Sequence, residues 1–489
     1  MSYLKSKVKE VLEYIKIVHQ NQTIYQAKLL DLYEGSIEKY LNQSLTNELS
    51  SEAAKRAKQR STPINILPKL IGKTSAVYSY GVDRDIDGNS VDSENVTFYE
   101  KDLALDSVMG IANEYLNLFR CCAIEPYLNK GKPSLRVLPP TQFTVYSDNQ
   151  VNPMEMTIFV KFVGKVHSLT PRTNTQGVSL VDASNVIKEV ELYHFYSDKE
   201  FLIVDAEGNI RYELMEENPE GINYYGKIPF VYLNTSKNLL IPLPNTDFFK
   251  MSLLIPKLIT DMAYASMFQS HSILYTIDIE AEKLSANPDQ LWDLKSSEGE
   301  NTNPQIGAIK PEIDIEKVLL LIKDTLSIWF DSLGIKASGI NNITAESAAS
   351  GVAKAIDQSD VEEIRSKQKV IMRKAELNLW DLLATQHAYW ATEEGGEVKP
   401  FSSSFNVNIQ YHDPEPLVDY KTTIEATKLK YEAGLTSFRR AVQEANPDLS
   451  SEEVDELIKE IEQEKQDKVV VAKELFKEPK EEEKLVMPE

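Results

Sequence analysis

The amino-acid sequence predicts an α+β protein that is mostly helical, with a small antiparallel β region inserted among the helices. Apolar residues recur at helical spacing toward both ends of the chain, whereas Ser134–Asn234 changes to short runs of strand-forming residues separated by turns. A helical pattern without proline then runs from Thr344 to Trp390, well beyond the usual length of a globular helix. These observations predict long helices around one compact β region.

The chain begins with helical patterns. Met1–His19 carries its apolar residues on one side, helical spacing continues to Glu48, and a second pattern covers Leu103–Phe119. Since Met1–His19 is amphipathic, with no basic start followed by an apolar run, we expect no secretion signal. The strands of the β region are expected at Leu135–Leu138, Phe143–Tyr146, Met156–Val163, Val186–Tyr196, Phe201–Val204 and Phe230–Leu233.

Two helices are predicted on either side of a polar segment. Asp247–Tyr275 is apolar on nearly all sides and contains Pro256, which would kink the helix or start it anew. Ile277–Pro311 is polar, with little periodicity. The second helix, Ile315–Leu333, repeats its apolar residues at three and four, and Gly334 is well placed to end it.

The long helical pattern follows a loop that contains glycine and asparagine. Thr344 can cap its N-terminus, and small residues around Ser350, Gly351 and Ala353 would let a neighbouring backbone approach closely. A short strand is expected afterwards at Phe405–Gln410. Two final helices are expected at Leu417–Ala433 and Ser450–Lys468, separated by the turn residues Gly434 and Asn446-Pro447.

Composition excludes several classes of protein. With 53 Lys and Arg against 75 Asp and Glu, the net charge is −22, which disfavours wrapping nucleic acid through phosphate contacts. The two cysteines, Cys121 and Cys122, are too few for a disulfide framework or a thiolate zinc site. The most apolar stretch contains Lys257 and Asp261, which would be costly inside a bilayer, so no membrane span is expected.

One acidic segment matches a calcium-binding pattern. Asp83, Asp85, Asp87 and Glu94 follow the spacing of a calcium loop, in which carboxylates converge on the ion around a glycine turn. Serine stands where such loops carry an apolar residue, and the chain has no second loop to pair with. A solvated acidic loop is therefore the favoured interpretation, and calcium is the one cofactor left open.

No catalytic motif stands out. The six histidines are scattered without metal-ligand spacing, and the sequence has neither a nucleophile elbow nor a Cys-x-x-Cys pair. Gly72-Lys73-Thr74 lacks the earlier glycine of a phosphate-binding loop. The sequence therefore gives no positive evidence for an enzyme.

Four stretches, taken in their order, carry a resemblance to a known family. They are Ser134–Asp148 with its two prolines, Tyr225-Gly226-Lys227-Ile228-Pro229-Phe230-Val231 through Asn234, Ser350-Gly351-Val352-Ala353-Lys354-Ala355, and Gly434-Leu435-Thr436-Ser437. Together with the order helix, polar excursion, helix, loop and long helix, they resemble the portal proteins of tailed bacteriophages, particularly those of Bacillus siphophages. The match covers most of residues 60–465 by the order of its features.

The resemblance implies a non-enzymatic ring, typically of twelve copies, at one vertex of a virus capsid. Its channel would pass double-stranded DNA without sequence specificity during packaging and ejection. Its partners would be copies of itself, the major capsid and scaffolding proteins, the terminase motor and a head-tail adaptor. The protein would be assembled in the host cytoplasm and reside in the virion.

The same resemblance implies a domain order. The wing would be 1–245, the first stem helix 246–276, the clip 277–311, the second stem helix 312–333, the tunnel loop 334–344, the long helix with its return to the wing 345–411, and the crown 412–489. The tunnel loop would bring Lys336, Asn341 and Asn342 close to DNA.

Two other functions remain open at this point. The first is a helical scaffold or adaptor without a DNA channel, which would have no need of the stem, clip and loop order. The second is a calcium-binding or metal-dependent protein that uses residues 83–94. Calorimetric titration with calcium, with Glu94→Gln as control, distinguishes the second from the others.

Overall fold

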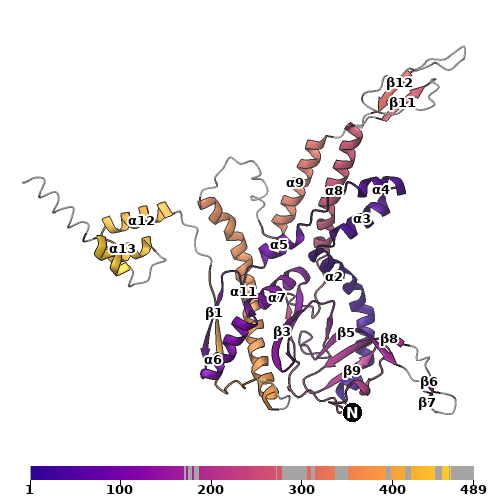
Figure 1. The fold of residues 1–489 in the computed structure, drawn as a ribbon, viewed down its shortest axis with the longest axis vertical. Coiled ribbons are helices and arrows are strands. Elements are labelled where there is room, and N and C mark those ends of the chain that lie inside the picture. Colours follow the sequence, from indigo (N-terminus) through magenta and orange to yellow (C-terminus); the bar gives the residue numbers. More distant parts are fainter. Residues whose placement is uncertain are drawn as a thin grey trace, which may run out of the picture. The chain divides into compact units, whose positions relative to one another are not determined.

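The computed structural model describes residues 2–169, 172–173, 179–180, 187–270, 273–277, 305–309, 314–335, 351–392, 398–413, 420–446, 454–461 and 463. The chain is 54% helical and carries small antiparallel sheets, which confirms the predicted α+β class (Figure 1). It divides into two compact units. One comprises Met1–Ala345 with Gln358–Pro414, and the other Glu346–Asp357 with Glu415–Glu489.

Helices open the first unit. They are α1 (Tyr3–Tyr14), the π-helix η1 (Ile15–His19), α2 (Gln20–Tyr33), α3 (Ile37–Glu48), α4 (Ser51–Lys58) and α5 (Leu67–Thr74). In α1 the side chains of Leu4, Val8 and Val11 recur every three or four residues and are buried. They pack against the β region, so the amphipathic face predicted from the sequence is the face that α1 buries.

The β region consists mainly of two antiparallel sheets. One has the order β4 (Phe143–Tyr146), β5 (Ile158–Leu169), β8 (Ile187–Tyr196), β9 (Phe201–Asp205), and the other the order β10 (Val231–Asn234), β2 (Cys121–Asn129), β3 (Lys132–Leu138). The predicted strands are confirmed, with boundaries that differ by a few residues. The sequence analysis missed β2, which is almost continuously buried and therefore lacks the alternation of a half-buried strand. A two-residue pair, β6 (Arg172–Thr173) and β7 (Ser179–Leu180), lies between β5 and β8.

A second core lies around the long helix α11 (Gly351–Thr392). Against it pack α7 (Leu105–Phe119), β2, and a two-stranded sheet of β1 (Val82–Asp87) and β13 (Asn406–Tyr411). Between β1 and α7 the chain forms α6 (Ser90–Thr97) and the π-helix η2 (Phe98–Asp102). Leu379, Trp380 and Leu383 of α11 are almost completely buried there, which fixes this helix to the sheet.

The polar segment between the two predicted helices is bordered on each side by a β-strand, which the sequence did not predict. Helix α8 (Thr246–Ser270) ends five residues before Tyr275, because β11 (Ile273–Ile277) pairs with β12 (Gln305–Ile309) in an antiparallel sheet. Helix α9 (Ile315–Ser332) follows, with Asp314 as its N-cap. The prediction of helix up to Tyr275 is therefore wrong, and the polar segment, in which little periodicity was seen, contains β12 near its end.

The second unit contains α12 (Tyr420–Glu432), α13 (Phe438–Ala445) and a helical stretch at 454–461. We predicted only turn residues between two helices here, but α13 occupies that connection. Its N-cap Ser437 accepts a hydrogen bond from the backbone of Arg440. Gly434 adopts a left-handed φ of 70° after α12, as a C-terminal glycine does.

Candidate functional site

Helices α8 and α9 contact one another and form the most distinctive feature of the first unit (Figure 1). Phe248 of α8 and Trp329 of α9 meet edge-to-face, with ring centroids 6.3 Å apart. Both are buried in one apolar cluster with side chains from α2, α3, α5 and α7. The pair is therefore rooted in the N-terminal helices at this end, while β11 and β12 pair across the other end.

Pro256 lies inside α8 without ending the helix, so the predicted new start of the helix at this proline does not occur. The carbonyl of Pro256 accepts a hydrogen bond from Thr260 Oγ1 at 2.7 Å. Next to the proline, Lys257 Nζ donates to Glu48 of α3 at 2.6 Å. Tertiary packing against α2, α3 and α4 thus holds a helix that the proline alone would weaken.

Helix α9 carries apolar side chains that the described residues leave exposed. Leu320, Leu321 and Ile328 are 57%, 54% and 71% exposed. Leu321 and Ile328 lie two turns apart on the same face, with Leu320 beside them. Exposed apolar side chains gathered on one helix are candidates for a contact with another molecule.

The end of α9 leads into the segment predicted to be the tunnel loop. Gly334 has a φ of 76°, and the backbone N–H of Ile335 donates to the carbonyl of Phe330, as the predicted glycine stop requires. Lys336, Asn341, Asn342 and Ser350 lie outside the described residues, as does Thr344, the predicted cap.

Helix α11 begins at Gly351, so Gly351 and Ala353 lie in its first turn. The predicted long helix is confirmed over 42 residues. The prediction that a neighbouring backbone packs closely against Ser350, Gly351 and Ala353 falls on residues whose surroundings are not described.

Helix α11 is fixed to strand β1 by a buried ion pair. Arg84 Nε donates to Glu376 Oε1, and the exposed fractions of the two side chains are 2% and 0%. Arg84 also donates to Asp106 at 2.6 Å and to Glu100 at 3.2 Å, while Tyr78 donates to Glu376 at 2.6 Å. Burial alone would lower the pKa of Arg84, but these carboxylates raise it, so the guanidinium stays charged.

A second arginine, Arg365 of α11, donates hydrogen bonds to backbone carbonyls. Arg365 is fully buried, and its guanidinium donates to the carbonyls of Ala76, Val77 and His412. It also lies 3.3 Å from Asp413. Three segments far apart in the sequence are thus joined at one side chain, which keeps the start of the described packed part of α11 in place.

A buried histidine secures the other end of the helix. His387 Nδ1 lies 3.0 Å from the carbonyl of Lys399, and Nε2 lies 2.7 Å from the hydroxyl of Tyr99. Because a carbonyl only accepts, Nδ1 carries the proton and Nε2 accepts from the tyrosine. Burial lowers the pKa of His387 to about 4, although the bond to Lys399 opposes this shift.

This histidine predicts a pH-dependent stability. The unfolded chain binds a proton near the reference pKa of 6.5, whereas the folded chain binds it only near 4. Stability from His387 is therefore complete above pH 6.5 and is lost as the pH falls toward 4, by about 2 kcal/mol at pH 5. We expect the drop in urea midpoint between pH 7 and pH 5 to be smaller in His387→Gln than in the wild type. Equal drops in the two proteins would contradict this assignment.

The predicted acidic loop is a strand and a helix. Asp83, Asp85 and Asp87 alternate along the exposed face of β1, where side chains two positions apart are separated by about 6–7 Å. Asp83 lies 2.7 Å from His412 Nε2, Asp85 accepts from Gln410, and Glu94 of α6 accepts from Lys399 at 2.7 Å. The four carboxylates do not surround one point, and among the described residues no group of three or more His, Cys, Asp or Glu could hold a metal ion.

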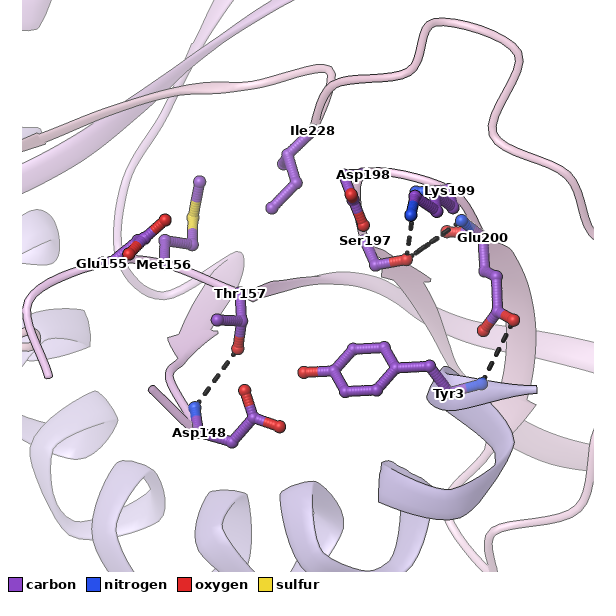
Figure 2. A pocket seen from close by; sticks show the side chains of 10 residues that line it. All are labelled: Tyr3, Asp148, Glu155, Met156, Thr157, Ser197, Asp198, Lys199, Glu200 and Ile228. Carbon is purple, nitrogen blue, oxygen red and sulfur yellow. Dashed lines mark hydrogen bonds between the residues drawn. The ribbon is translucent and has the colours of Figure 1, made fainter. Parts of the chain in front are cut away.

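A cavity of about 450 Å³ lies where α1 meets the four-stranded sheet (Figure 2). Tyr3 points into it toward Asp148 and Thr157. Burial would raise the pKa of Asp148, but hydrogen bonds from Tyr3 and Thr157 and the charge of Lys7 hold it below its usual value. Glu200 accepts from the backbone N–H groups of Tyr3 at 3.1 Å and Leu4 at 2.7 Å, so it caps α1. The polar groups here join α1 to the sheet.

Sequence reasoning missed the two arginines that secure α11. Val82–Asp87 does alternate between inward and outward positions, with Arg84 inward, and this period of two was the available signal for a strand. Nothing local in the sequence marks Arg365, since its acceptors are backbone carbonyls from distant segments.

Within the part of the chain that the structure describes, no helix combines the length and the apolar character needed to cross a membrane. Comparison with protein-family models and with curated proteins finds no match to this chain.

Proposed function

We propose that this protein is a non-enzymatic, ring-forming portal protein, a channel for double-stranded DNA at one vertex of a virus capsid. The observation that carries the proposal is the order of elements α8, β11, β12, α9 and α11 in the chain. Two contacting helices, a strand pair across their ends, and a long helix further along the chain are what the stem, clip and wing of that family require.

The exposed face of α9 supports assembly into a closed ring. Leu320, Leu321 and Ile328 would be buried if neighbouring copies packed their stem helices side by side. Val370, 71% exposed, is an exposed apolar side chain on a second helix, α11. In a ring each copy uses two different surfaces, so both α9 and α11 would find partners on their neighbours.

Charge supports a channel that does not hold DNA. Twelve copies at −22 would together carry about −260 before counterions bind. A channel wall of that sign repels phosphate, so DNA would pass without adhering. On this proposal Lys336, Asn341 and Asn342 would supply transient phosphate contacts, and the hydrolysis of ATP would belong to a separate motor that docks near residues 277–311.

The size of the purified chain tests this function. Light scattering of the wild type is expected to give a closed species of about twelve times 55.4 kDa, with a central hole in negative-stain images. A monodisperse monomer or dimer across salt conditions, without rings at high concentration, would contradict the portal function and favour the helical scaffold.

A further inference from the structure

Apart from the stem, the first unit carries a groove formed by two adjoining hollows of about 650 and 430 Å³. The two share Phe201, Glu217 and Asn218. Residues 213–225, which follow β9, form most of the groove, and Tyr389 near the end of α11 completes one side.

The floor of the groove is aromatic and held rigidly. Tyr224 stacks on Tyr389 with the ring centroids 5.4 Å apart and the planes within 10°, yet Tyr224 is 51% exposed. Tyr225 meets Tyr389 edge-on and accepts a hydrogen bond from Trp390 Nε1. Asn223 Nδ2 donates to the carbonyl of Ser197 and to that of Lys227, which fixes the loop. A floor that is already ordered loses little entropy when a ligand binds.

The rim is acidic. Glu213, Glu216, Glu217 and Glu220 are exposed within eight residues of sequence. Glu213 already pairs with Arg211 at 3.2 Å. Within the described part of the chain, no Lys or Arg forms a salt bridge with the other three carboxylates.

An arginine side chain can interact with the aromatic floor and with the acidic rim at the same time. A guanidinium stacks flat on an aromatic ring and also donates two parallel hydrogen bonds to a carboxylate, whereas an ammonium has no plane. Ile222 and Leu214, 39% and 48% exposed, offer apolar contact beside the rings.

We propose that this groove binds an extended segment of a partner protein in which arginine alternates with apolar residues. The arginine lies over Tyr224 and pairs with Glu217, and the apolar side chains contact Ile222 and Leu214. Charge complementarity selects this occupant, because the charged residues that line the groove are Glu213, Glu216 and Glu217. The binding does not depend on ring formation, so the two proposals fail separately.

The test uses the full chain and fluorescence anisotropy. The probe is a fluorescein-labelled hexapeptide, glycine-leucine-arginine-leucine-arginine-glycine. Two matched probes replace arginine by citrulline, which keeps the plane without the charge, and by lysine, which keeps the charge without the plane. We expect the arginine probe to bind most tightly and its affinity to fall with added salt.

Variants assign the binding to the groove. Tyr224→Ala and Glu217→Gln are each expected to weaken the arginine probe about two- to fivefold, in line with exposed cation–π and ion-pair contacts. Glu207→Gln, an exposed glutamate outside the groove, is the charge-matched control and should leave binding unchanged. Equal binding of the arginine and citrulline probes, an equal loss in Glu207→Gln, or no binding at about 1 mM would each overturn the proposal.

Discussion

Replacing both Leu321 and Ile328 with glutamate is expected to dissociate the proposed ring into smaller species. The two side chains are more than half exposed in one chain and lie on one face of α9. Burial of the exposed parts of these two side chains contributes about 2–4 kcal/mol to a contact, and a carboxylate placed in an apolar interface adds a further penalty. Since a ring repeats the contact at every subunit, the loss accumulates. Light scattering at equal protein concentration measures it.

A control variant separates apolar contact from charge. The double variant changes the net charge by −2, and so does Lys323→Glu, which alters an exposed residue on a different face of the same helix. Glutamate is a good helix former, so α9 itself should persist in both proteins and the circular dichroism should match the wild type. If Lys323→Glu dissociated the ring equally, or the double variant left it intact, the role assigned to this face would be wrong.

Replacing Arg84 with methionine is expected to destabilise the first unit by about 3–5 kcal/mol, because it leaves Glu376 buried without its cationic partner. The Glu376 carboxylate is fully buried. Without Arg84, its remaining hydrogen-bond donor among the described residues would be the Tyr78 hydroxyl. The measurement is the urea midpoint at pH 7. An unchanged m-value, the slope of the unfolding free energy against urea concentration, would show that the variant exposes the same surface on unfolding as the wild type.

The double variant Arg84→Met, Glu376→Leu tests the cause. Replacing a buried ion pair by apolar residues is often neutral or stabilising, so the double variant should recover most of the loss. Arg56→Met removes a surface arginine that lies 3.7 Å from Glu52, and we expect a change of less than about 1 kcal/mol. A double variant no more stable than Arg84→Met would show that the arginine acts through packing rather than by neutralising Glu376.

Elements whose apolar spacing is local were predictable from the sequence. The helix Ile315–Ser332 and its stop at Gly334 follow from spacing and a glycine, and the strand Phe143–Tyr146 was predicted with its observed bounds. In both elements the apolar positions that defined the prediction include the buried ones, such as Trp329 and Val145.

Elements that depend on distant partners were not predictable. The sequence predicts an acidic loop where the charged strand β1 forms. Arg84 can be buried there because it pairs with Glu376, which lies 292 positions away. Strands β11 and β12 pair across a polar segment of 27 residues, so neither shows the turn signal of a short hairpin. The groove beside Tyr224 forms where a loop contacts the end of α11, and no pattern within the sequence predicts that contact.

A reconstruction of the wild-type assembly by electron cryomicroscopy tests the central claim most directly. The account predicts a closed ring of identical subunits whose channel wall is formed by α8 and α9, with the exposed face of α9 buried against a neighbouring copy. A chain that remains monomeric, an open filament, or a ring whose channel is lined by other elements would contradict it.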